Sequence, residues 1–152
     1  MGSLKKKLIS ILFIIGVVIV IALLNVGPPK VVILSEGNKI PIVQGSYCWK
    51  KITGVECVDK ILPIEIIEKK NIEPFPVSPQ SEIKINFKKN PTEEIEVQIE
   101  EVEESGDIVD VERSIVKGNV LSAPKESGVY IYSVTGRWDK GSSSYSFIIK
   151  VK

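Results

Sequence analysis

Two cysteines and a dense run of carboxylates are the side chains of this sequence whose types and spacing could do chemistry. Cys48 and Cys57 are the only cysteines among the 152 residues, and there is no histidine. A Ser-His-Asp triad, a histidine general base and a histidine-ligated metal are therefore excluded. Acid–base chemistry is left to carboxylates, and the cysteine pair is a disulfide, a redox pair or a thiolate metal site.

The spacing of the two cysteines favours a disulfide. Eight residues separate Cys48 from Cys57, whereas redox pairs are usually C-x-x-C, and no further Cys or His completes a zinc shell. Closing so short a loop stabilises a fold by about 2–3 kcal/mol in the chain-entropy model. Tyr47, Trp49 and Lys50 lie in or beside this loop, and we predict that they form a binding surface. The alternative is that Trp49 covers the disulfide and belongs to the core.

Ten acidic residues and no basic residue occur from Glu93 to Glu112. Alternation along 94–100 turns the acidic side chains toward solvent, so a solvated strand and loop is the first interpretation. Weak Ca²⁺ binding by clustered carboxylates is one alternative, although the spacing does not match an EF-hand. A pair of carboxylates for glycoside hydrolysis is another, but no pair stands out. We predict no cofactor, and the calcium hypothesis rests on Glu103, Glu104, Asp107 and Asp110.

Residues 8–26 form the most apolar part of the chain. The 17 residues from Leu8 to Leu24 carry no charge, and Lys5, Lys6 and Lys7 precede them. A helix of this length spans a hydrocarbon core of about 30 Å with slight thinning. We predict a single-pass signal anchor at 8–26, with residues 1–7 in the cytoplasm and the C-terminal domain outside it. A cleaved secretory signal, which would release the domain, is the alternative.

A short stalk, residues 27–30, follows the predicted anchor and contains Pro28 and Pro29. The first 29 residues carry a charge of +3, whereas the remainder has 17 basic and 19 acidic residues. This near-neutral remainder gives no electrostatic case for binding nucleic acid.

β-branched residues dominate the sequence after the stalk. From residue 30 onward there are 18 Ile and 15 Val against three Leu and one Ala. Branched side chains lose χ1 freedom in helices and pack well on pleated sheets. Apolar and polar residues also alternate at the period of half-buried strands over 82–88, 94–100, 130–138 and 144–152. We predict an all-β domain with almost no helix outside residues 8–26.

Turn residues separate these segments at a spacing too short for crossover helices. We therefore predict antiparallel pairing in a two-sheet β-sandwich of about seven strands. Residues 31–61 are predicted as an N-terminal β subregion with the disulfide loop, and residues 81–152 as the sandwich strands. Four prolines fall within residues 62–80, which we interpret as an extended connector.

Two sets of segments carry resemblances to known proteins. Gly128-Val129-Tyr130-Ile131-Tyr132, Gly136-Arg137-Trp138 and Tyr145-Ser146-Phe147-Ile148-Ile149 resemble the last strands of immunoglobulin-like modules of bacterial surface proteins. That resemblance implies an immunoglobulin-like sandwich with a tyrosine corner, in which the Tyr130 hydroxyl bonds back to the chain before its strand.

The second resemblance covers nearly the whole part after the stalk. Gly45-Ser46-Tyr47-Cys48-Trp49, Cys57-Val58-Asp59 and Trp138-Asp139-Lys140-Gly141 are similar to segments of small membrane-anchored or lipid-anchored extracytoplasmic proteins of Gram-positive bacilli, a group without a characterised activity. The chain lacks the lipid-accepting Cys of the lipoprotein members. The resemblance implies fold and location, and it adds no activity.

We expect a non-enzymatic binding or structural module of the cell envelope, whose partner is a protein, a wall polymer or a small ligand. The alternatives are a carboxylate-based envelope enzyme or enzyme inhibitor, and a weak calcium-binding module. Fold alone supports no narrower statement.

Overall fold

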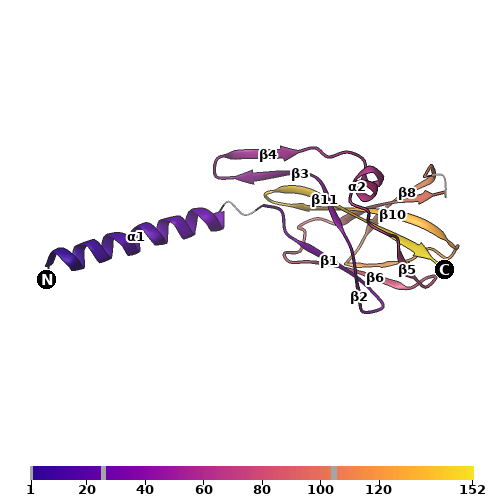
Figure 1. Cartoon of the computed structure of the whole chain (residues 1–152), viewed down its shortest axis with the longest axis horizontal. Coiled ribbons are helices and arrows are strands. Elements are labelled where there is room, and N and C mark those ends of the chain that lie inside the picture. The colour runs from indigo at the N-terminus through magenta and orange to yellow at the C-terminus, as the bar shows by residue number, and fades with distance from the viewer. Residues whose placement is uncertain (1, 25–26, 104–105) are drawn as a thin grey trace.

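The computed structural model is built mainly of strands (Figure 1). It describes residues 2–24, 27–103 and 106–152, and within the first helix it describes the side chains of residues 4–22. In chain order the described elements are α1 (Gly2–Leu24), β1 (Val31–Ser35), β2 (Asn38–Ile40), β3 (Val43–Lys51), β4 (Gly54–Val58), α2 (Pro63–Lys69), β5 (Phe75–Val77), β6 (Glu82–Phe87), β7 (Ile95–Val102), β8 (Ile108–Val116), β9 (Val120–Ser122), β10 (Gly128–Trp138) and β11 (Gly141–Val151).

The strands form two sheets that share one core. The first sheet has the order β2-β1-β6-β9, and the second has the order β4-β3-β11-β10-β7-β8 with β5 also on β11. Ile33 and Ile85 of the first sheet pack in one cluster with Val134 and Phe147 of the second. The predicted all-β sandwich is confirmed. The predicted number of about seven strands is wrong, because residues 31–61 add two strands to each sheet.

The alternation found in the sequence gives each central strand its inward face. In β6, Ile83, Ile85 and Phe87 are buried and the residues between them are exposed. The predicted tyrosine corner is also confirmed, since the Tyr130 hydroxyl donates a hydrogen bond of 3.2 Å to the Glu126 carbonyl before β10.

The segment 62–80 is not the extended connector that its prolines indicate. Pro63 occupies the first turn of α2, where its fixed φ suits a helix and its missing N–H costs nothing. Ile66 and Ile67 of this helix are buried against Ile131 and Ile148 on the outer face of the second sheet. α2 therefore covers one end of that face, and it explains why Ile148 breaks the alternation of β11.

β5 lies in the same segment and corrects the prediction of purely antiparallel pairing. It pairs in parallel with the end of β11, with Phe75 opposite Ile149 and Val77 opposite Val151. β3 pairs antiparallel with the first half of the same edge of β11. One long strand is thus completed on this side by two separate partners.

α1 projects away from the sandwich (Figure 1). Among the residues that the structure describes, no helix combines the length and the apolarity needed to cross a membrane. Residues 25 and 26, which end the predicted span 8–26, lie outside the described residues.

Candidate functional site

The predicted disulfide is present and fastens a β-hairpin. Cys48 of β3 and Cys57 of β4 are bonded and lie directly opposite each other, with their Cα atoms 4.0 Å apart. β4 is one of the two edge strands of the second sheet and pairs only with β3 among the described elements. The bond therefore fixes the register of an edge strand that would otherwise be held by a short ladder alone.

The structure separates the three residues predicted as a binding surface. Trp49 is only 4% exposed and packs edge-to-face against Trp138, with ring centroids 5.6 Å apart. Lys50 is exposed, and Tyr47 is half-buried. The alternative interpretation of Trp49 as a core residue is confirmed.

Tyr47 belongs to a small polar network on the hairpin. Its hydroxyl donates to one carboxylate oxygen of Glu56 at 2.7 Å, and the Lys51 ammonium donates to the other at 2.7 Å. These two hydrogen bonds, the one from Lys51 first, lower the pKa of the Glu56 carboxyl. The hydrogen bond to Glu56 also raises the pKa of Tyr47 and of Lys51. The stabilisation from this pairing is present above the pKa of an unfolded Glu and is lost as the pH falls through the lowered value.

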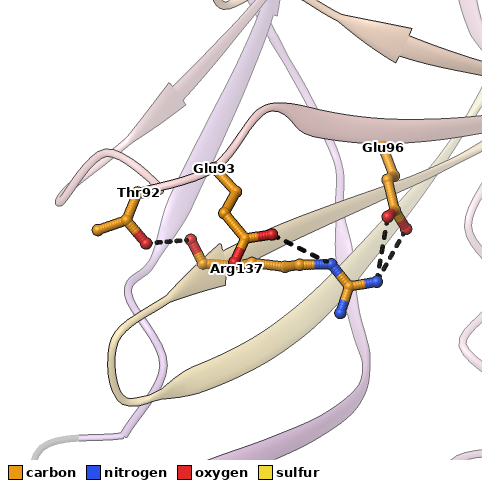
Figure 2. Close-up of polar contacts among 4 residues, drawn as sticks. All are labelled: Thr92, Glu93, Glu96 and Arg137. Atoms are coloured by element: carbon orange, nitrogen blue, oxygen red, sulfur yellow. Dashed lines mark hydrogen bonds and ion pairs between the residues drawn. The ribbon is translucent and has the colours of Figure 1, made fainter.

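The start of the acidic run is held by one arginine. Figure 2 shows the Arg137 guanidinium between two carboxylates, with Nη2 at 3.1 and 3.2 Å from the Glu96 oxygens and Nε at 3.9 Å from Glu93. The backbone N–H of Thr92 donates to the Arg137 carbonyl at 2.8 Å. The Arg137 side chain is 43% exposed, so these ion pairs are weak contributors to stability. They tie the loop before β7 to the end of β10.

Three of the four predicted calcium ligands lie where the chain passes from β7 to β8. Glu103, Asp107 and Asp110 are exposed, and Glu104 lies outside the described residues. The Asp110 carboxylate accepts a hydrogen bond of 2.8 Å from the N–H of Val111. Within residues 2–24, 27–103 and 106–152, no group of three or more acidic or cysteine side chains is arranged to hold a metal ion. The calcium site stays a prediction.

Sequence reasoning missed a groove between β8 and β9, where the two sheets separate. It has a volume of about 460 Å³. The pairing of β10, β7 and β8 places its residues in two rows across the inner face of the second sheet. One row is Tyr130, Glu101 and Asp110, and the other is Tyr132, Ile99 and Glu112.

The chemistry of this groove is acidic and aromatic. Glu126 from the loop before β10 adds a fourth carboxylate, and the described lining residues include no Lys or Arg. The sequence did contain one sign of an acidic inner surface. Glu101 has the same parity along the strand as Ile95, Val97 and Ile99, which were expected to face inward. The facing residues of β9 could not be inferred, since strand parity says nothing about which sheet edges meet.

Tyr132 is the most unusual residue of the groove. It is fully buried and stacks on Phe147, with ring centroids 4.9 Å apart. Its hydroxyl has no hydrogen-bond partner among the described residues, and burial raises the pKa of the phenol. A buried polar group without a partner loses its hydration without compensation, and native proteins contain few of them.

No family model, curated protein sequence or solved structure matches this chain.

Tyr130 and Tyr132 lie two residues apart on the same face of β10, and substituting each of them gives a matched test of what their hydroxyl groups contribute to stability. We expect Tyr130→Phe to lower the free energy of unfolding by about 1 kcal/mol, because it removes the bond to Glu126. Tyr132→Phe removes an unpartnered hydroxyl and should leave stability unchanged within about 0.5 kcal/mol, or raise it. Chemical denaturation followed by tryptophan fluorescence measures both. Equal destabilisation by the two variants would show that Tyr132 has a partner.

Proposed function

We propose that this chain is a membrane-attached, non-enzymatic binding module whose immunoglobulin-like sandwich lies outside the cytoplasm. The observation that carries the proposal is the surface of α1. From Leu8 to Ile21 its large apolar side chains are between 42% and 72% exposed on every side of the helix. A helix that is apolar all round requires an apolar environment, which a bilayer supplies.

The charge before the apolar segment supports an orientation. Lys5, Lys6 and Lys7 precede it, and the first acidic residue is Glu36. Positive residues at this position favour a cytoplasmic N-terminus and export of the sandwich. The bond between Cys48 and Cys57 suits an oxidising compartment outside the cytoplasm. The resemblance to small membrane-anchored proteins of Gram-positive bacilli agrees with this location.

Strand order supports the immunoglobulin-like assignment. β6 and β9 pair in one sheet, and β7, β10 and β11 pair in the other, as in the two-sheet modules of that class. The parallel strand β5 beside β11 and the Tyr130 corner agree with it. The strands β1 to β4 extend both sheets beyond such a module.

The groove between β8 and β9 is the ligand surface that the geometry favours. The four carboxylates that line it suit a cationic group such as an ammonium or guanidinium. Asp110 and Glu112 are exposed, whereas a general acid needs a carboxyl that burial keeps protonated at neutral pH. The exposure of these carboxylates supports binding rather than the carboxylate-based enzyme hypothesis.

Vesicle flotation of the full chain tests the membrane attachment. We expect the wild-type protein to float with phosphatidylcholine vesicles and the variant Ile14→Lys with Val18→Lys to stay in the aqueous fraction. Each lysine at the middle of a membrane helix costs about 2.5–3.5 kcal/mol. The matched control is Val109→Lys with Ile115→Lys, two exposed residues of β8, which should float like the wild type.

The attachment hypothesis fails if the wild-type chain does not float with the vesicles. A chain that stays in the aqueous fraction as an oligomer joined through α1 would have the same consequence. The intact mass of the protein isolated from expressing cells distinguishes the two forms of the N-terminal segment. An uncleaved anchor keeps the mass of the full chain, whereas a cleaved signal leaves a smaller protein.

Titration with a trilysine peptide, followed by NMR, tests the groove. We expect amide shifts at residues 99–101 and 110–112, and an affinity about tenfold lower in Asp110→Asn with Glu112→Gln, which removes two charge-assisted contacts. Glu94→Gln with Asp139→Asn removes the same charge outside the groove and should leave the affinity unchanged. Equal loss in both variants would show unspecific attraction and contradict the groove.

A further inference from the structure

One end of the sandwich, here named the α1 end, faces the first helix. β1 leaves the stalk at Val31, which pairs with Phe87 at the end of β6. Following the antiparallel pairing, the loops 88–94, 117–119 and 139–140 lie at this same end. Figure 1 shows the closed end of the β3–β4 hairpin on the same side.

The stalk is fastened to the α1 end. The Tyr145 hydroxyl donates a hydrogen bond to the Pro29 carbonyl, and the N–H of Lys88 donates to the Lys30 carbonyl at 2.8 Å. Between Leu24, the last residue of α1, and Pro29 the chain can reach no farther than about 18 Å. With α1 in a membrane, the α1 end must therefore stay close to the lipid surface.

The α1 end is basic. Six lysines are exposed in the stalk, the hairpin and the three loops, namely Lys30, Lys50, Lys88, Lys89, Lys117 and Lys140. The exposed acidic residues there are Glu93, Glu94 and Asp139, so the net charge of this end is +3. Lys51 is not counted because it is paired with Glu56 at 2.7 Å. The groove acids Glu101, Asp110 and Glu126 lie toward the opposite end, at the end of β7, the start of β8 and the loop before β10.

The hairpin adds two apolar side chains at its tip. Ile52 is 57% exposed and Val55 is 68% exposed. Trp49 pairs with the first residue of β11, Gly141, so residues 50–55 extend past the neighbouring turn. The disulfide and the Tyr47–Glu56–Lys51 network keep this extension ordered, which lowers the entropic cost of docking. Apolar tips flanked by lysines are suited to the boundary between headgroups and acyl chains.

We propose that the α1 end docks on an anionic lipid surface, with Ile52 and Val55 inserted at the headgroup level and the lysines against lipid phosphates. This inference rests on the proposed membrane attachment through α1. It adds a fixed orientation, in which the groove acids Glu101, Asp110 and Glu126 lie toward the end of the sandwich that is farther from the membrane. Charge complementarity and the short, fastened stalk select the lipid surface over a second copy of the chain as the occupant.

Hydrogen exchange of the full chain in two kinds of vesicle tests the docking. One is phosphatidylcholine, and the other is phosphatidylcholine with phosphatidylglycerol. We expect amides 50–56 to exchange several-fold more slowly in the anionic vesicles, whereas amides 36–39 at the opposite end exchange equally in both. High salt should remove the difference, because the lysine attraction is screened.

The hairpin variant Ile52→Ser with Val55→Ser should lose the slowing while the protein stays in the vesicles. Val109→Ser, which changes an exposed valine of β8, is the control and should keep it. Equal exchange in the two vesicle types, with the protein inserted, overturns the docking and leaves the attachment intact. Exchange of amides 50–56 that slows with the density of protein in the vesicles, and not with lipid charge, would show that the hairpin contacts a second copy of the chain. That result would also overturn the docking. A chain that does not enter either vesicle overturns the attachment itself.

Discussion

The hydrogen-bonded ladder between β10 and β11 is the interaction on which the other elements depend. It runs without a break from Gly128 opposite Val151 to Trp138 opposite Gly141. β7 attaches to one side of this pair, and β3 and β5 attach to the other. At Gly141 a side chain would clash with the Cys48 carbonyl, so a glycine is required where the hairpin joins the ladder. A change of register here would displace both the hairpin and the groove.

Local patterns predicted the strands on each side of this ladder, and non-local contacts decided the rest. Alternation identified the inward faces of β6, β7, β10 and β11, and the cysteine spacing identified the disulfide. In β7 the expectation that the acidic side chains face solvent is wrong for Glu100, which is buried. α2 was missed because the four prolines of residues 62–80 favour an extended chain, whereas Ile66 and Ile67 gain burial only from the outer face of a sheet that the sequence does not reveal. The parallel pairing of β5 and the groove at β8 and β9 depend on which edges meet, and no residue pattern records that.

The polar residues divide the sandwich into two ends with different chemistry. Lysines, the fastened stalk and the stapled hairpin gather where the chain leaves α1, and carboxylates surround Tyr132 toward the other end. The same disulfide that fixes the edge strand also keeps Ile52 and Val55 at the tip. In the proposed docking, one structural element would thus serve both stability and orientation, while the buried Trp49 belongs to the core.

Neutron reflectometry of the full chain in a supported bilayer that contains phosphatidylglycerol tests the proposed arrangement most directly. We expect protein density to begin within the headgroup layer and to extend outward by the length of the sandwich, with no layer of water between. A water-filled layer between the headgroups and the sandwich would contradict docking of the α1 end. Absence of protein from the hydrocarbon region would contradict the attachment through α1.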